Sequence, residues 1–115
     1  CAFAEGVALC GTRGWLFDAG ETHDEKVMRR ECGRLRASLC AAGDAEKLAF
    51  LHYPPVYPQA NAAEIVAILQ EFGIKRCFYG HLHGASIPRA VCGTVDGIDY
   101  RLISADALRF FPYKI

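Results

Sequence analysis

Two histidines separated by one residue, His81 and His83, occupy the stretch Tyr79-Gly80-His81-Leu82-His83-Gly84, directly after an apolar run. If this run continues as a strand, alternate side chains share a face, so we expect the two imidazoles to point the same way. The flanking glycines allow a tight turn and the close approach of a ligand. The pattern therefore favours metal binding by His81 and His83 over two packed or solvated side chains.

A third histidine, His52, holds the same kind of position. The apolar run Leu48-Ala49-Phe50-Leu51 predicts a buried strand that leads directly into His52. The prolines of Tyr53-Pro54-Pro55 then prevent further sheet pairing. Because ligands of open α/β sheets bind at the carboxyl ends of the strands, we expect His52 at the same sheet edge as the other two histidines.

The loop Gly11-Thr12-Arg13-Gly14-Trp15 presents a guanidinium between two glycines. Arg13 could hold a phosphate or carboxylate through paired hydrogen bonds, or it could be a surface arginine paired with a nearby acid. The sequence leaves both interpretations open. Arg13 and Tyr53 are the substrate-binding residues that we name.

The elements that must position these residues alternate between strands and helices. A strand at Val7–Cys10 and a turn at Asp18–Glu21 precede a helix that a capping box, Thr22-x-x-Glu25, predicts to begin at Thr22 and to end near Ala42. His23, in its first turn, is interpreted as solvated.

A second helix follows Asn61, interpreted as its cap, and ends at Gly73, before a third strand at Lys75–Tyr79. The order strand–helix–strand–helix–strand implies parallel pairing. Asp96-Gly97 then predicts a hairpin between Ala90–Val95 and Ile98–Ser104. The last segment, Leu108–Ile115, is expected to add an edge strand or a packed tail.

Composition limits the classes of partner. The 115 residues suit a single domain, and 13 basic residues balance 13 acidic ones without a basic block, so neither nucleic acid nor a membrane surface is indicated. The six cysteines show no Cys-x-x-Cys pair, although their even number leaves a disulfide framework possible. We expect reduced, buried thiols in a cytoplasmic protein.

With these residues in place, the sequence resembles the carboxyl-terminal half of the calcineurin-like metallophosphoesterases. The resemblance rests on Gly80-His81-Leu82-His83, which matches the family's Gly-His-x-His motif, on the strand-terminal His52, and on the strand–helix order between them. The extended strings Gly-Thr-Arg-Gly-Trp, Leu-His-Tyr-Pro-Pro and Tyr-Gly-His-Leu-His-Gly look like a bacterial subgroup described as predicted phosphohydrolases. The match spans nearly the whole chain.

In that family, an aspartate and a water or hydroxide bridge two divalent metal ions. The resemblance implies that His52 and His81 bind one ion, that His83 binds the other, and that the substrate is a phosphate ester. Imidazole ligands suit manganese, iron, zinc and nickel alike, so these residues do not select the metal. The resemblance also implies a fold of two packed sheets with helices outside, so this chain would be half of a four-layer α/β-β/α sandwich.

The family's remaining ligands come from Asp-x-His, Gly-Asp-x-x-Asp and Gly-Asn-His motifs in its amino-terminal half, and this sequence contains none of them. We identify no catalytic residue here, and we expect residues 1–115 to be inactive alone. They would be the carboxyl-terminal part of a larger phosphoesterase, with the missing half or another chain covering an apolar sheet face. The alternative is a non-catalytic module, or a mononuclear metal-binding relative that uses the three histidines.

Overall fold

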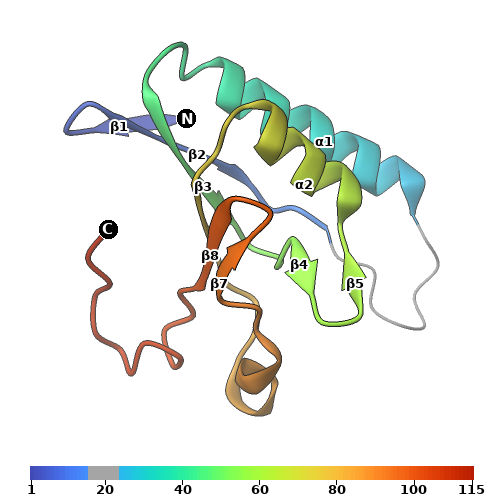
Figure 1. Ribbon diagram of the computed structural model, residues 1–115, viewed down its shortest axis with the longest axis vertical. Coiled ribbons are helices and arrows are strands. Elements are labelled where there is room, and N and C mark those ends of the chain that lie inside the picture. The colour runs from blue at the N-terminus through green and yellow to red at the C-terminus, as the bar shows by residue number, and fades with distance from the viewer. Residues whose placement is uncertain (16–23) are drawn as a thin grey trace.

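Four parallel strands form the centre of the sheet in the computed structural model, which describes residues 1–15 and 24–115. The spatial order is β1-β2-β3-β6-β8-β7, with antiparallel pairing only between β1 and β2 and between β7 and β8 (Figure 1). The strands of this sheet are β1 (Ala2–Ala4), β2 (Val7–Thr12), β3 (Glu46–Leu51), β6 (Arg76–Tyr79), β7 (Gly93–Val95) and β8 (Ile98–Leu102). The predicted mixed α/β fold with a parallel core is therefore confirmed.

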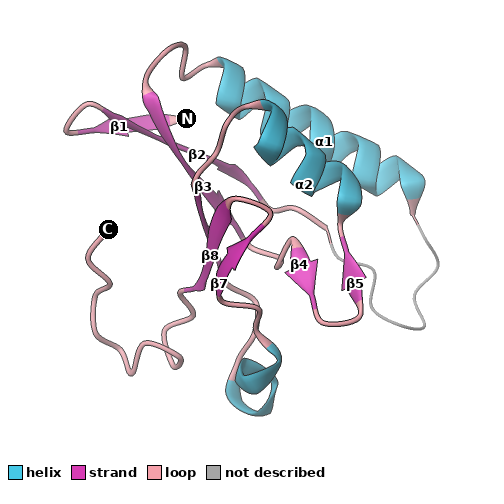
Figure 2. Cartoon of the chain, in the orientation of Figure 1, coloured by secondary structure: helices cyan, strands magenta, loops and turns pink. Residues whose placement is uncertain are grey.

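Two helices, α1 (Glu25–Cys40) and α2 (Ala63–Glu71), lie side by side on one face of this sheet (Figure 2). Each helix connects two parallel strands, as the alternating sequence pattern predicts. A short 3₁₀ helix, η1 (Gly84–Arg89), follows β6. The core between helices and sheet is made of buried apolar side chains that include Met28, Leu35, Leu39, Ile65, Ile68, Leu69, Ala8, Cys10, Ala49, Leu51, Cys77 and Tyr79.

The first helix begins later than the capping box predicts. Its N-cap is Asp24, whose carboxylate accepts hydrogen bonds from two backbone amides of the first turn, each at 3.1 Å. An aspartate at the N-cap accepts hydrogen bonds from these amides, and the positive end of the helix dipole stabilises its negative charge. It is therefore at least as good a cap as a threonine. The predicted cap Thr22, the turn at Asp18–Glu21 and His23 lie outside the described residues.

The prediction that Asn61 caps the second helix is wrong. Asn61 belongs to β5 (Ala60–Asn61), which pairs antiparallel with β4 (Val56–Tyr57) in a separate two-stranded sheet. The N-cap of α2 is Ala62, which makes no side-chain capping bond. Pairing with Val56 holds the backbone of Asn61 in an extended conformation, so the N-cap falls on the next residue, Ala62.

The predicted hairpin forms between β7 and β8, where Val95 pairs with Ile98. Asp96 and Gly97 both have positive φ, 48° and 83°, which suits a type I′ turn. The first strand of this hairpin, β7, is shorter than predicted, because it begins at Gly93 and not at Ala90.

The last segment contains no strand among its described residues, so the expected edge strand is wrong there. Phe110 and Phe111 are 81% and 75% exposed. Tyr113 approaches the sheet, with its ring centroid 6.1 Å from that of Phe78.

The sheet face opposite the helices is also apolar. Since Ala49 and Leu51 point into the helix-covered core, Phe50 between them points the other way. Phe50 stacks on Phe78 of the neighbouring strand, with ring centroids 5.0 Å apart. Figure 1 shows the final segment on this side, away from α1 and α2.

All six cysteines are free. Cys10 and Cys77 are buried as expected, but Cys1, Cys40 and Cys92 are exposed, because they lie at the chain start, a helix end and a loop. Within the described residues, no helix has the length and apolar character needed to cross a membrane.

The close approach of β2 to β3 depends on Gly11, because a Cβ there would collide with the backbone carbonyl of Phe50. We expect Gly11→Ala to lower the free energy of unfolding by roughly 1–3 kcal/mol in urea denaturation. The matched control is Gly33→Ala within α1, where a Cβ meets nothing within 4 Å. This control should gain up to about 1 kcal/mol. A Gly11→Ala variant as stable as the parent would contradict the expectation.

Candidate functional site

The parallel pairing of β3 with β6 brings their carboxyl ends to the same edge of the sheet, where Leu51 lies opposite Tyr79. His52 follows β3 directly. The backbone amide of Gly80 donates to the carbonyl oxygens of both Leu51 and His52 at 3.2 Å, so the two strand-end loops are tied together. His52 and His81 are thereby placed on neighbouring loops.

Two of the three predicted ligands meet. Nε2 of His52 lies 3.2 Å from Nδ1 of His81, and the two ring planes are inclined by 73°. The backbone of His81 is left-handed, with φ of 69°, which is uncommon for a residue other than glycine. This conformation turns the chain out of the strand direction immediately after Gly80.

His83 does not join this pair. The expectation that His81 and His83 share a strand face is wrong, because β6 ends at Tyr79 and the left-handed His81 breaks the alternation. Nδ1 of His83 lies instead 2.9 Å from Oδ1 of Asp106. Across residues 1–15 and 24–115, no group of three or more histidine, cysteine, aspartate or glutamate side chains is arranged to hold a metal ion.

Asp106 is a site residue that the sequence analysis missed. Its carboxylate accepts hydrogen bonds from the backbone amides of Gly84 at 2.8 Å and Ala107 at 3.0 Å. The Gly84 bond and the contact with His83 lower the pKa of Asp106. Its position shortly after β8, the fourth parallel strand, is the same strand-end signal that singled out His52 and could have revealed it.

The two predicted substrate-binding residues lie beside the His52–His81 pair. The carbonyl oxygen of Arg13 accepts hydrogen bonds from the amides of His52 at 3.1 Å and Tyr53 at 2.9 Å. The ring of Tyr53 lies 4.4 Å from that of His81, centroid to centroid. The guanidinium carbon of Arg13 lies 5.1 Å from the Trp15 ring and 6.0 Å from the Tyr53 ring. The structure therefore brings Arg13, Trp15 and Tyr53 together as a cation–aromatic wall.

Glu31 of α1 lies 3.9 Å from the Arg13 guanidinium. Its carboxylate has no exposed surface. The Thr12 hydroxyl donates to its Oε2 at 2.7 Å, and Arg34 donates to its Oε1 at 2.9 Å. Burial alone would raise the pKa of Glu31, but the bond from Thr12 and the charge of Arg34 outweigh it and lower the pKa. The missed signal was its place on the apolar side of α1, between Met28 and Leu35, where a charged residue is unexpected.

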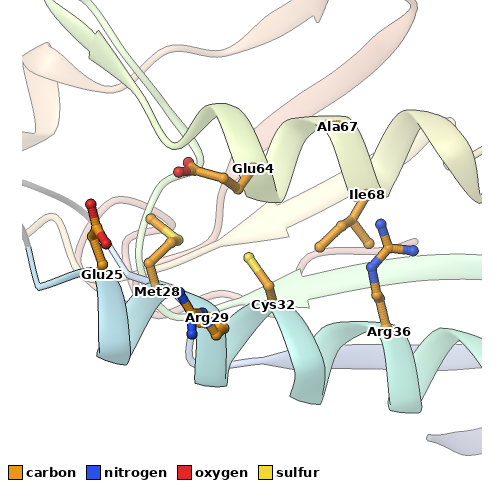
Figure 3. A pocket seen from close by; sticks show the side chains of 8 residues that line it. All are labelled: Glu25, Met28, Arg29, Cys32, Arg36, Glu64, Ala67 and Ile68. Atoms are coloured by element: carbon orange, nitrogen blue, oxygen red, sulfur yellow. The ribbon is translucent and has the colours of Figure 1, made fainter.

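The groove in Figure 3 lies apart from these residues, between α1 and α2. It encloses about 490 Å³. Its lining mixes charged and apolar side chains, namely Glu25, Met28, Arg29, Cys32, Arg36, Glu64, Ala67 and Ile68. None of the predicted site residues contributes to it.

Comparisons of the chain with protein-family models, with curated proteins and with solved structures found no match.

The amide of Gly84 should report the ionisation of Asp106, to which it donates. In an NMR titration, we expect the Gly84 amide proton resonance to move with a midpoint below 3.8, the ordinary pKa of an aspartate. Because the folded pKa is lowered, the contact is present above pH 3.8 and is lost as the pH falls through the lowered value. Asp106→Asn should abolish the transition and the control Asp99→Asn should retain it. A midpoint at or above 3.8 in the parent would contradict this account.

Proposed function

We propose that this chain is the carboxyl-terminal part of a dinuclear metal-dependent phosphohydrolase. In this proposal, His52 and His81 bind one divalent ion and His83 binds the second. The observation that carries the proposal is the 3.2 Å separation between the ring nitrogens of His52 and His81.

That separation is compatible with a shared ion. Two imidazole nitrogens, each about 2.0–2.1 Å from one tetrahedral zinc ion, are about 3.3 Å apart. Neutral imidazoles at 3.2 Å can form only one hydrogen bond with each other, whereas a shared ion would use a lone pair of each ring. The donors do not select among manganese, iron, zinc and nickel.

The contact between His83 and Asp106 supports His83 as a ligand of the second ion. A carboxylate that accepts the Nδ1 proton of a histidine orients the ring and leaves Nε2 with the lone pair that binds a metal. The Gly84 and Ala107 amides donate hydrogen bonds to the Asp106 carboxylate and hold it in place. The carboxylate can therefore fix the orientation of the His83 ring.

The described residues supply too few ligands for a paired-metal centre. We propose that a preceding segment or another chain contributes the bridging carboxylate and the other ligands. The same partner would pack on the apolar face around Phe50 and Phe78 and complete a four-layer α/β-β/α sandwich. A pair of bound divalent ions makes hydroxide available near neutral pH and polarises a phosphoryl group. The residues of this chain would hold the ions and orient the ester through Arg13 and Tyr53.

A cytoplasmic location fits the free thiols of all six cysteines. The partner that we propose is a phosphorylated substrate.

A second candidate function is a mononuclear or non-catalytic metal-binding module. It is favoured by the separation of His83 from the His52–His81 pair. Under this alternative, one ion bound by His52 and His81 would serve structure or partner binding.

Metal binding tests both candidates. We expect His52→Ala and His81→Ala each to weaken the binding of Mn²⁺ or Zn²⁺ by at least about tenfold in isothermal titration calorimetry, because each removes one of two paired donors. Cys40→Ser, which removes an exposed thiol at the end of α1, is the control and should bind as the parent does. Unchanged affinity in both histidine variants would exclude a metal site here.

Activity separates the two candidates. We expect the 115-residue chain alone, with Mn²⁺ or Zn²⁺, to hydrolyse p-nitrophenyl phosphate poorly, because its sequence lacks the Asp-x-His, Gly-Asp-x-x-Asp and Gly-Asn-His motifs that supply the remaining ligands in the family it resembles. A longer protein that carries the missing ligands should be active and should lose activity in His81→Ala and His83→Ala. Full activity of the chain alone would refute the shared-site proposal, and inactivity of the longer protein would favour the binding module.

A further inference from the structure

We propose that Phe110 and Phe111 of one copy of this chain dock into the groove between α1 and α2 of a second copy. These two side chains are called the aromatic tip. The contact joins two different surfaces of the same protein, so the association is head-to-tail. It uses none of the candidate metal ligands and does not rest on the proposed phosphohydrolase function.

The turn before the aromatic tip holds it in solvent in a strained conformation. Phe110 and Phe111 are 81% and 75% exposed. The backbones of Arg109 and Phe110 are both left-handed, with φ of 52° and 61°, which is strained for residues other than glycine. The Phe110 amide donates to the Ala105 carbonyl at 2.7 Å, and the Phe111 amide donates to the Leu108 carbonyl at 3.1 Å. A strained turn that exposes two phenylalanines favours a binding role for them.

Two positively charged side chains flank the aromatic tip. Arg109 directly precedes Phe110, and Lys114 follows Phe111 by three residues. Both are exposed, and neither forms a salt bridge within the part of the chain that the structure describes. The surface that receives this tip is therefore expected to combine an apolar floor with negative charge.

The groove between α1 and α2 offers an apolar floor of suitable size. It encloses about 490 Å³, and Met28, Cys32 and Ile68 contribute apolar surface to its lining. Sites that enclose a small organic group typically have roughly 300–1,000 Å³, so this groove has room for aromatic side chains. Figure 3 shows Glu25 and Glu64 at the same end of the groove as Met28.

The lining of the groove is also acidic. Its Arg36 is neutralised by Glu71, to which it donates two hydrogen bonds of 2.7 Å each. Glu25 and Glu64 form no salt bridge among residues 1–15 and 24–115, and Arg29 is the other arginine of the lining. Two carboxylates against one remaining arginine leave a net negative charge, which complements the basic residues beside the aromatic tip.

The occupant of the groove is a second copy, because the aromatic tip lies across the sheet from the groove of its own chain. Figure 1 shows the final segment on the side away from α1 and α2. Each molecule therefore presents one tip and one groove in different directions. A contact between unlike surfaces leaves both ends of a pair open to further copies, and it generates rings or open chains.

Complementary variants test the contact. The double variant Phe110→Ser with Phe111→Ser removes the aromatic tip and leaves the groove intact. Ala67→Arg places a large basic side chain in the groove, from an exposed position of α2, and leaves the tip intact. In analytical ultracentrifugation, we expect the average mass of the parent chain to rise over a roughly hundredfold increase in concentration. Each variant alone should lose this rise.

Mixing the two variants gives the decisive measurement. The mixture contains one intact tip and one intact groove for each pair of chains, so it should form a one-to-one complex and no larger species. Association through the apolar sheet face around Phe50 and Phe78 would instead be unaffected by either variant.

Matched controls keep both surfaces. Phe3→Ser removes another phenylalanine, which is 62% exposed on β1. Ala37→Arg introduces the same basic side chain at an exposed position of α1 outside the groove. Both controls should associate as the parent does. Thermal unfolding of every variant, followed by circular dichroism, checks that the fold is retained.

Cys32 reports the occupation of the groove directly. Its thiol belongs to the groove lining, whereas the thiol of Cys40 is exposed at the end of the same helix. In an isotope-labelled sample of the tip variant, alkylation of Cys32 should slow at least about threefold when the Ala67→Arg chain is added. Alkylation of Cys40, followed in the same mass spectra, should keep its rate.

Three outcomes would overturn the inference. They are a parent chain that stays monomeric over the whole concentration range, self-association that survives in both variants, and a mixture of the variants that forms no one-to-one complex. The result is separate from the proposed function, because His52→Ala and His81→Ala should weaken metal binding and leave the self-association unchanged.

Discussion

The parallel pairing of β3 with β6 is the constraint on which the candidate site depends. It places Leu51 opposite Tyr79, and the Gly80 amide then donates to carbonyls on both sides of the β3 end. Since backbone hydrogen bonds determine this register, the positions of His52 and His81 follow from the sheet. A slip by one residue would turn side chains to the opposite face and separate the two imidazoles.

The left-handed backbone of His81 divides the histidines between two environments. A non-glycine residue with φ of 69° is strained, and such strain persists only where the surrounding structure imposes it. Here the bonds of Gly80 to the β3 end precede the turn, and the pairing of His83 with Asp106 follows it. The result is one histidine directed toward its neighbour on the next loop and one directed toward a carboxylate.

Glu31 fixes the loop that follows β2, much as Asp106 fixes His83. Helix α1 packs mainly through apolar contacts, but it also carries a buried carboxylate that reaches the end of β2 through Thr12. This contact joins the helix layer to the loop that holds Arg13, while the amides of His52 and Tyr53 tie the same loop to β3. The same hydrogen bonds from the His52 and Tyr53 amides to the Arg13 carbonyl therefore fix both the cation–aromatic wall and the paired histidines.

The sequence by itself determined the alternation of strands and helices, the Asp96-Gly97 hairpin and the strand-end position of His52, since periodicity and turn chemistry are local properties. It could not determine where the helices start, because Asp24 and the pairing of Asn61 with Val56 compete locally with the predicted caps. Only the tertiary structure decided that His81 meets His52, that His83 meets Asp106, and that Glu31 is buried beside Arg13. These contacts join residues far apart in the chain, so the register of the parallel strands and the packing of α1 create them.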